Sequence, residues 1–333
     1  MYFKSLPKVL LLFVIFISVN TSAQNFDKSK GKIFGSIYFD AFTELSSGYN
    51  KTGMEIKRAY FGYKYKLDEN FSAYIKLDIG SPEDLSLNSH IKRYAYFKNA
   101  GIKYTKDKLT INVGIIDVLM FTHQEKMWGH RYISKSFLDA YKFGPKADIG
   151  FNANYKFNKY FAINFGFYNG EGYSKLQGDD TYRAGLGIVS HPIKNSTVKV
   201  YFDYSQKKID RVGTFIFVGY KLSNKLSMGA EYNYQFNNGF VAEQDLSGFS
   251  IFGDYYIIPK VQLFVRYDYL DSKVLPNSQN PWHYAKDGDR IISGIQYDIR
   301  KNIKIAVDYQ AWNPHDEKKN YRPFLFTNLV FKF

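Results

Sequence analysis

The feature that most constrains this chain is a repeated alternation of apolar and polar residues after Lys32. Segments of roughly ten residues have an apolar side chain at every second position and end in turn residues, as in 71–79. Because side chains alternate across a β-strand, each such segment has one apolar and one polar face. The pattern predicts an all-β protein with strands at 33–42, 54–66, 71–79, 91–105, 109–116, 146–157, 160–169, 181–190, 197–205, 212–222, 226–235, 246–257, 261–270, 290–299, 303–312 and 322–333.

The connections between these segments distinguish a soluble sandwich from a membrane barrel. Every second connection is a short turn, such as 106–108 or 258–260, and the others are mostly longer loops, such as 43–53 and 271–289. Short turns on one side and long loops on the other are typical of barrels that cross a bilayer with the apolar face outward. We therefore predict a 16-stranded antiparallel transmembrane β-barrel over 33–333.

The first 23 residues have the layout of a secretory signal peptide. Lys4 and Lys8 precede the apolar run Val9–Val19, and small or polar residues follow up to Ala23. This run is too short for a membrane anchor, which needs about 20 apolar residues. We expect residues 1–23 to be removed on export, residues 24–32 to form a short tail, and the barrel to lie in the cell outer membrane. Phe333 resembles the terminal signal read by the barrel-assembly machinery, although an edge strand that happens to end in Phe is the alternative.

The strand number itself predicts a channel, since sixteen strands leave an aqueous lumen where eight do not. The longest connection, 117–145, is the expected constriction, and we predict that it folds into the lumen. Its apolar residues would be costly to expose to water outside the barrel; they are Leu119, Met120, Phe121, Met127, Trp128, Ile133, Phe137 and Leu138. An external cap or a trimer contact is the alternative for this loop.

The charge distribution predicts a preference for anions. The net charge is +14, and cationic residues concentrate on the second and fourth predicted strands. On the second strand, an outward apolar register through Phe61 would direct Arg58, Lys64 and Lys66 inward, whereas the register of the fourth strand is ambiguous because 99–101 could hold a bulge. Carboxylates such as Asp78 argue against strict exclusion of cations. The predicted anion-selecting residues are Arg58, Lys64, Lys66, Lys76, Lys103, Lys126, Arg131 and Lys135.

Several stretches resemble the phosphate-selective porin O and P family of outer-membrane porins. They are the run from Ile56 to Gly80, the strand 109–116 leading into the long loop, Arg131-Tyr-Ile-Ser-Lys-Ser136, Phe143-Gly-Pro-Lys-Ala-Asp-Ile-Gly150 and Phe264-Val-Arg-Tyr-Asp-Tyr-Leu270. The resemblance implies a sixteen-stranded channel, usually a homotrimer, whose third loop constricts the lumen, with phosphate as a candidate solute. The phosphate-binding residues of that family cannot be matched one by one in this chain.

No pattern in the chain points to catalysis, a metal or a cofactor. The chain has no cysteine, which excludes disulfides, thiolate zinc sites, Cys nucleophiles and a lipid-anchored Cys. His123, Glu125 and His130 share one loop and could in principle bind a metal, but most histidines in loops are not metal ligands. The expected partners are small hydrophilic solutes and anions, outer-membrane lipid and lipopolysaccharide, and export removes the opportunity for nucleic acid. A structural or adhesive barrel with a closed lumen is the main alternative to a porin, and a barrel hydrolase is a weaker one.

Overall fold

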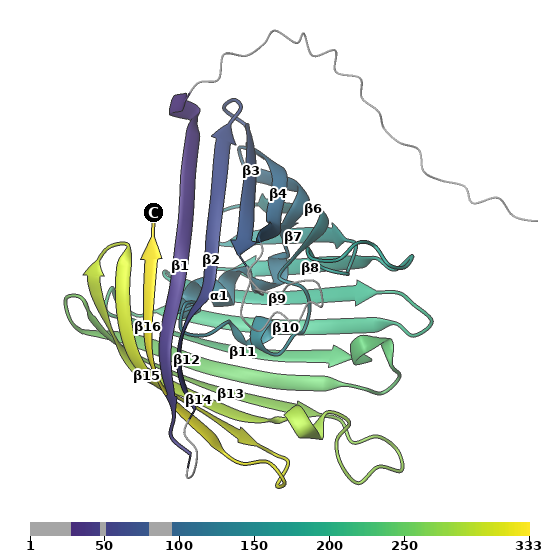
Figure 1. The fold of residues 1–333 in the computed structure, drawn as a ribbon. Coiled ribbons are helices and arrows are strands. Elements are labelled where there is room, and N and C mark those ends of the chain that lie inside the picture. The colour runs from purple at the N-terminus through teal and green to yellow at the C-terminus, as the bar shows by residue number, and fades with distance from the viewer. Residues whose placement is uncertain (1–27, 47–50, 80–94) are drawn as a thin grey trace, which may run out of the picture.

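The computed structural model describes residues 28–46, 51–79 and 95–333 and shows a closed, sixteen-stranded antiparallel barrel (Figure 1). Each strand pairs with its neighbours in sequence, and β1 pairs with β16 to close the sheet. The strands are β1 (Gly31–Glu44), β2 (Thr52–Lys66), β3 (Phe71–Ile79), β4 (Ala95–Lys106), β5 (Leu109–Asp117), β6 (Ala147–Lys156), β7 (Phe161–Tyr168), β8 (Arg183–Ser190), β9 (Ser196–Ser205), β10 (Arg211–Lys221), β11 (Leu226–Phe236), β12 (Leu246–Ile258), β13 (Val261–Ser272), β14 (Gly288–Arg300), β15 (Ile303–Pro314) and β16 (Arg322–Lys332).

The predicted fold class is confirmed, and the strand boundaries differ from the prediction by a few residues. β3 has the predicted bounds, and β1 begins at Gly31, two residues before the predicted start at 33. The predicted signal peptide, 1–23, and the predicted start of the fourth strand, 91–94, lie outside the described residues. The strands of 8 to 15 residues are long enough to cross a bilayer at a tilt.

The outer face of the barrel is apolar, and the inner face is largely polar. On β3, Ile75 is 45% exposed on the outside, whereas Asp78 is fully buried on the inside. Outward residues of other strands follow the same rule, with Ile102, Val113 and Val265 about half exposed. This arrangement suits hydrocarbon outside and closed backbone hydrogen bonding within the sheet, the two requirements of a membrane-spanning barrel.

The third loop, which we define as residues 118–146 between β5 and β6, lies inside the barrel as predicted (Figure 1). It contains the 3-10 helix η2 (Leu119–Phe121) and the α-helices α1 (Thr122–Trp128) and α2 (Phe137–Ala140). Its apolar side chains form two clusters with inward residues of the wall instead of reaching water, and these clusters are the core of the molecule. Three further 3-10 turns are η1 (Lys28–Lys30), η3 (Asn238–Phe240) and η4 (Tyr284–Lys286). Within the described residues, no helix is both long and apolar enough to cross a membrane.

Candidate functional site: the channel interior

The third loop is held against the wall by one large aromatic contact. Trp128, at the end of α1, is 1% exposed and packs edge-on against Phe252 of β12 and Phe264 of β13, at ring distances of 5.5 and 6.3 Å. Its indole Nε1 donates to the carbonyl oxygen of Ser134 at 2.9 Å, which ties the two halves of the loop together. Burial of this ring therefore fixes the position of α1 relative to the wall.

Two inward glycines make room for other loop side chains. A Cβ at Gly248 of β12 would lie 2.4 Å from the Phe137 ring, and a Cβ at Gly219 of β10 would lie 2.6 Å from Cε of Met127. Inward positions without side chains thus let the loop approach the sheet closely. Phe137 is completely buried as a result.

A buried arginine of the wall binds the loop backbone. Arg266 of β13 donates to both carboxylate oxygens of Asp268 at 2.7 Å, and its third nitrogen donates to the carbonyl oxygen of Lys135 at 2.6 Å. The guanidinium also lies 5.1 Å from the Trp128 ring. Arg266 and Asp268 are nearly inaccessible, so each charge depends on the other for compensation.

We expect Arg266→Met to lower the free energy of unfolding by about 3–5 kcal/mol, because it leaves the buried Asp268 charge without its partner. Equilibrium unfolding of the refolded barrel in urea measures this change. The double variant Arg266→Met/Asp268→Asn should recover much of the loss, since a neutral pair of similar volume removes the uncompensated charge. Equal destabilisation of the single and double variants would show that the contact with Lys135, and not the charge, is what matters.

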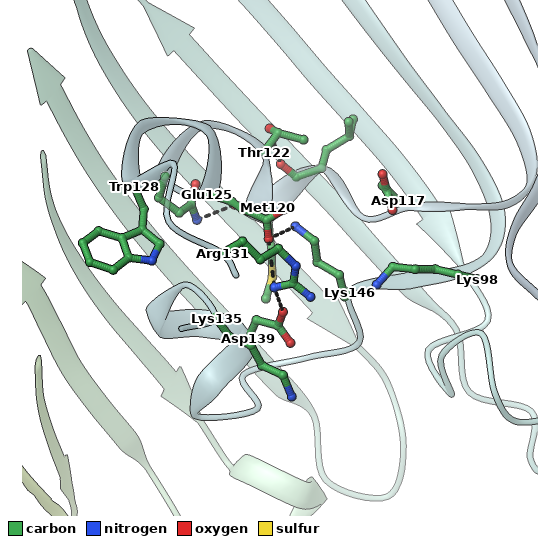
Figure 2. Close-up of polar contacts among 12 residues, drawn as sticks. Lys98, Asp117, Met120, Thr122, Glu125, Trp128, Arg131, Lys135, Asp139 and Lys146 are labelled. Carbon is green, nitrogen blue, oxygen red and sulfur yellow. Dashed lines mark hydrogen bonds and ion pairs between the residues drawn. The ribbon is translucent and has the colours of Figure 1, made fainter. Parts of the chain in front are cut away.

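The loop carries its own network of ion pairs, shown in Figure 2. Arg131 lies 2.5 Å from the Asp139 carboxylate and 3.4 Å from that of Glu125, and Lys146 lies 2.7 Å from Glu125. Burial alone would raise the pKa of the Asp139 carboxyl, but the adjacent Arg131 guanidinium outweighs burial and lowers that pKa to about 2. Asp139 is therefore ionised at neutral pH, and most of the Arg131 charge is balanced within the loop.

On the opposite wall, two β-bulges direct additional cations into the lumen. The register of β1 with β2 skips Lys57, and the register of β3 with β4 skips Lys98. Lys57 pairs with Asp40 at 2.6 Å, and Lys98 lies 3.8 Å from Asp78. A bulge places two consecutive side chains on nearly the same face, so Lys57 joins Arg58 inside the barrel.

Two of the residues predicted to form a basic wall, Arg58 and Lys76, have partners on these strands. Arg58 donates to the Asp78 carboxylate at 2.7 Å, and the ammonium group of Lys76 lies 4.2 Å from the centre of the Tyr60 ring. The ammonium group of Lys98 lies 5.0 Å from the centre of the same ring. This wall therefore combines cations, a carboxylate and an aromatic ring, and it is not purely cationic.

Two cavities remain on either side of the loop. The cavity on the long-loop side has a volume of about 760 Å³ and lies between the loop and strands β1, β2, β4 and β14–β16. The cavity on the short-turn side has a volume of about 340 Å³ and is bounded by α1 and the ends of β10–β13 and β15. We call them the outer cavity and the inner cavity.

The short-turn end of the lumen is rich in lysine. The register of each strand directs the following lysines inward at this end, namely Lys32, Lys64, Lys66, Lys103, Lys156, Lys221, Lys304 and Lys332. Within the part of the chain that the structure describes, only Lys304 of this set has a carboxylate within 4 Å, namely Asp298 at 3.5 Å. Lys103 lies close enough to Lys64 and to Lys156 for each of their charges to repel it. The strand registers also direct two carboxylates, Asp254 and Asp298, inward at this end.

The structure does not bring the predicted anion-selecting residues to one place. Arg58, Arg131 and Lys135 line the outer cavity, and Lys76 lies beside them at the Tyr60 ring. Lys64, Lys66 and Lys103 belong to the short-turn lysines, and Lys126 lines the inner cavity. The role of all eight in selecting anions stays a prediction.

Sequence reasoning missed several cations that occupy the interior. Arg183 pairs with Asp203, Lys199 donates to the loop carbonyl oxygen of Met120 at 3.1 Å, and both cations are completely buried. A signal was present for Arg266, because Arg266 and Asp268 alternate with outward Val265 and Tyr267 and must share the inner face. Lys57 and Lys98 had no such signal, since a bulge interrupts the alternation.

One histidine of the loop, His130, is engaged in packing. His130 lies 4.7 Å from the Phe264 ring and forms a hydrogen bond of 3.1 Å with Gln296. Burial, together with the positive charge of Lys304, lowers the pKa of His130 to about 3, so the ring is neutral at neutral pH. Across residues 28–46, 51–79 and 95–333, no group of three or more His, Asp or Glu side chains is arranged to hold a metal ion.

Comparison with known proteins relates the fold to outer-membrane channels. No family model matches the chain, and no curated protein matches it in sequence. Among solved structures, the outer membrane channel DcaP of Acinetobacter baumannii is similar with a TM-score of 0.68 and 13% identity, over 92% of this chain and 99% of that one. OmpF of Salmonella typhi, in complex with daunomycin, has a TM-score of 0.68 and 12% identity over 91% and 97%. The anion-selective porin from Comamonas acidovorans has a TM-score of 0.67 and 10% identity, over 91% of this chain and 99% of that one. At these identities the similarity shows a shared barrel fold.

Proposed function

We propose that this protein is a porin of the outer membrane, through which small hydrophilic solutes diffuse passively and anions pass more readily than cations. The observation that carries the proposal is the set of inward lysines at the short-turn end, most of which have no carboxylate within 4 Å among the residues that the structure describes. Rows of lysine in a narrow pore attract anions, because the low-dielectric wall focuses their field into the water. That solved structures of the same fold include an outer membrane channel and an anion-selective porin supports the proposal.

The finer parts of the proposal follow from the sequence. We infer export by the signal peptide 1–23, insertion by the barrel-assembly machinery, contact with lipopolysaccharide, and assembly as a homotrimer. Phosphate is a candidate solute because of the resemblance to the phosphate-selective porins. Addition of phosphate to a channel that conducts chloride tests the last point, because a bound phosphate should reduce the chloride current at a concentration where sulfate does not.

In a planar bilayer we expect a stepwise current. In a salt gradient its zero-current potential should have the sign that results when chloride crosses more readily than potassium. With a tenfold gradient of potassium chloride, an ideal anion channel gives about 59 mV, and we expect a fraction of this value because paired carboxylates remain in the lumen. The refolded full chain is the material for this measurement. A zero-current potential of the sign set by potassium at neutral pH would contradict the anion preference.

A structural barrel with a closed lumen is the second candidate, and the packing of the third loop favours it. The loop and the wall bury Trp128, Phe137 and Met120 almost completely, so much of the cross-section is filled. This candidate predicts that the refolded barrel inserts without any stepwise current. We place it second because the outer and inner cavities leave polar volume on both sides of the loop.

A further inference from the structure

The outer cavity contains an apolar surface where an aqueous channel should be polar. Phe42 of β1 and Phe324 and Phe326 of β16 point inward, because they alternate with outward residues such as Leu325. Their rings lie 5.8 to 6.4 Å apart and form a continuous patch, which we call the phenylalanine patch. All three rings remain partly accessible. Apolar surface that stays open to water inside a lumen usually marks a binding surface.

Cations surround this patch. The ammonium group of Lys51 lies 5.9 Å from the centre of the Phe42 ring, and that of Lys57 lies 5.4 Å from the centre of the Phe326 ring. The side chains that line the outer cavity include the cations Lys51, Lys57, Arg58, Arg131, Lys135 and Arg290, against the carboxylates Asp40 and Glu55. The cavity is thus both aromatic and positively charged.

Arg290 of β14 is the cation best placed to receive a ligand charge. Arg290 pairs with Trp312 of β15. On the same strand, Gln310 pairs with Phe324 of β16, and Phe326 of β16 pairs with Phe42 of β1. The arginine and the rings therefore occupy inward positions on neighbouring strands. Its guanidinium donates to the side-chain oxygen of Gln310. In the described parts of the chain no carboxylate lies within 4 Å of Arg290 or of Lys51, whereas Arg58 and Arg131 are each neutralised by an aspartate.

We propose that the outer cavity binds aromatic carboxylates, with the ring on the phenylalanine patch and the carboxylate on Arg290 and Lys51. The patch offers stacked and edge-on contacts to a ring, and a guanidinium offers two parallel donors to a carboxylate. An inorganic anion would use only the cations, and a neutral sugar would gain nothing from the charge. The inference rests on the proposed function and specifies a solute class for the same lumen.

Blockage of the chloride current by benzoate tests the proposal, with acetate as the matched carboxylate and benzyl alcohol as the matched neutral ring. In the wild-type channel, half-block by benzoate is expected at a concentration at least about tenfold below that of acetate or benzyl alcohol. Arg290→Gln should raise the half-blocking benzoate concentration about tenfold, the size of one charge-assisted contact. Phe42→Leu/Phe326→Leu keeps apolar bulk but removes two rings, and it should bring the half-blocking concentration of benzoate close to that of acetate. Lys225→Gln, which removes a cation from the lining of the inner cavity, is the control and should leave the half-blocking concentration of benzoate unchanged.

The outcomes separate this inference from the proposed function. A channel that conducts with anion preference but responds equally to benzoate and acetate overturns the inference and leaves the porin function in place. Blockage by glucose that exceeds blockage by benzoate also overturns it, since the patch would then serve neutral solutes. If the refolded barrel does not conduct, the porin function fails. Calorimetric titration of the detergent-solubilised full chain with benzoate and with acetate then tests the proposed binding site by itself, and equal affinity for the two would overturn it.

Discussion

Exchange of Lys64, Lys103 and Lys156 for glutamate is expected to reverse the sign of the zero-current potential in a potassium chloride gradient. The three lysines are on β2, β4 and β6 and face the lumen near its short-turn end, where Lys103 is close enough to Lys64 and to Lys156 for their charges to repel it. Each exchange alters the local charge by two units, and none of the three lysines has a carboxylate within 4 Å among the described residues. The change therefore acts on charge that reaches the pore water without compensation.

The size of the change in the zero-current potential depends on how strongly these charges act across the lumen. Two unit charges about 4 Å apart interact by about 4 kcal/mol at an effective dielectric of 20, and water and salt in an open lumen reduce this value. We therefore expect the reversed sign at about 0.01 M salt and a smaller potential at 1 M, where the Debye length falls from about 30 to about 3 Å.

The matched control places the same charge change outside the lumen. Lys175→Glu/Lys208→Glu/Lys318→Glu alters three exposed lysines of the long loops and should leave the sign of the potential as in the wild type. If the control shifts the potential as far as the lumen variant does, the effect arises from the surface potential at the channel mouth. An unchanged sign in the lumen variant would exclude the short-turn lysines from ion selection.

Arg58 is a poorer choice for such an experiment, although the sequence directs attention to it. Its guanidinium lies 2.7 Å from Asp78, which is fully buried. Arg58→Glu would bring two carboxylates together in a poorly solvated place and destabilise the barrel, and any change in ion preference could then reflect misfolding. Lys64 is exposed to the lumen, and in the described part of the chain no carboxylate lies within 4 Å of it.

The barrel was predictable because its physical determinants are local in sequence. Alternation with period two and the alternating lengths of the connections are visible residue by residue, and β3 (Phe71–Ile79) has the predicted bounds. The inward position of the third loop also follows from composition, because Trp128, Phe137 and their apolar neighbours need a place away from water.

The charges of the lumen were less predictable because they depend on contacts between strands. The pairing of Arg58 with Asp78 requires the register of β2 with β3, and the inward position of Lys98 requires a bulge that only pairing with β3 locates. The sequence indicates a possible bulge at 99–101, whereas the structure has the bulge at Lys98. The phenylalanine patch was within reach of the sequence, since an outward Leu325 implies inward Phe324 and Phe326.

Replacement of two buried rings of the third loop, Trp128→Ala/Phe137→Ala, is expected to release the loop from the wall. Each side chain is at most 1% exposed, and truncation of a buried aromatic residue costs about 3–5 kcal/mol. The wall itself remains closed by its sixteen antiparallel pairings, so we expect a folded barrel with a wider and fluctuating current. The same change also removes the hydrogen bond between the Trp128 indole and Ser134, which joins α1 to the segment before α2.

Limited digestion with trypsin reports the position of the loop directly. Arg131 lies in the loop and its side chain is only 15% exposed, because Glu125 and Asp139 hold it against the loop interior. The wild-type barrel should therefore resist cleavage after Arg131, and the double variant should be cleaved there while the strands stay intact. The control is Phe202→Ala, which removes an outward ring that is 46% exposed and should change neither cleavage nor current. A variant that loses stability but keeps both the protected loop and the wild-type current would show that the backbone contacts of Arg266 and Lys199 suffice to hold the loop.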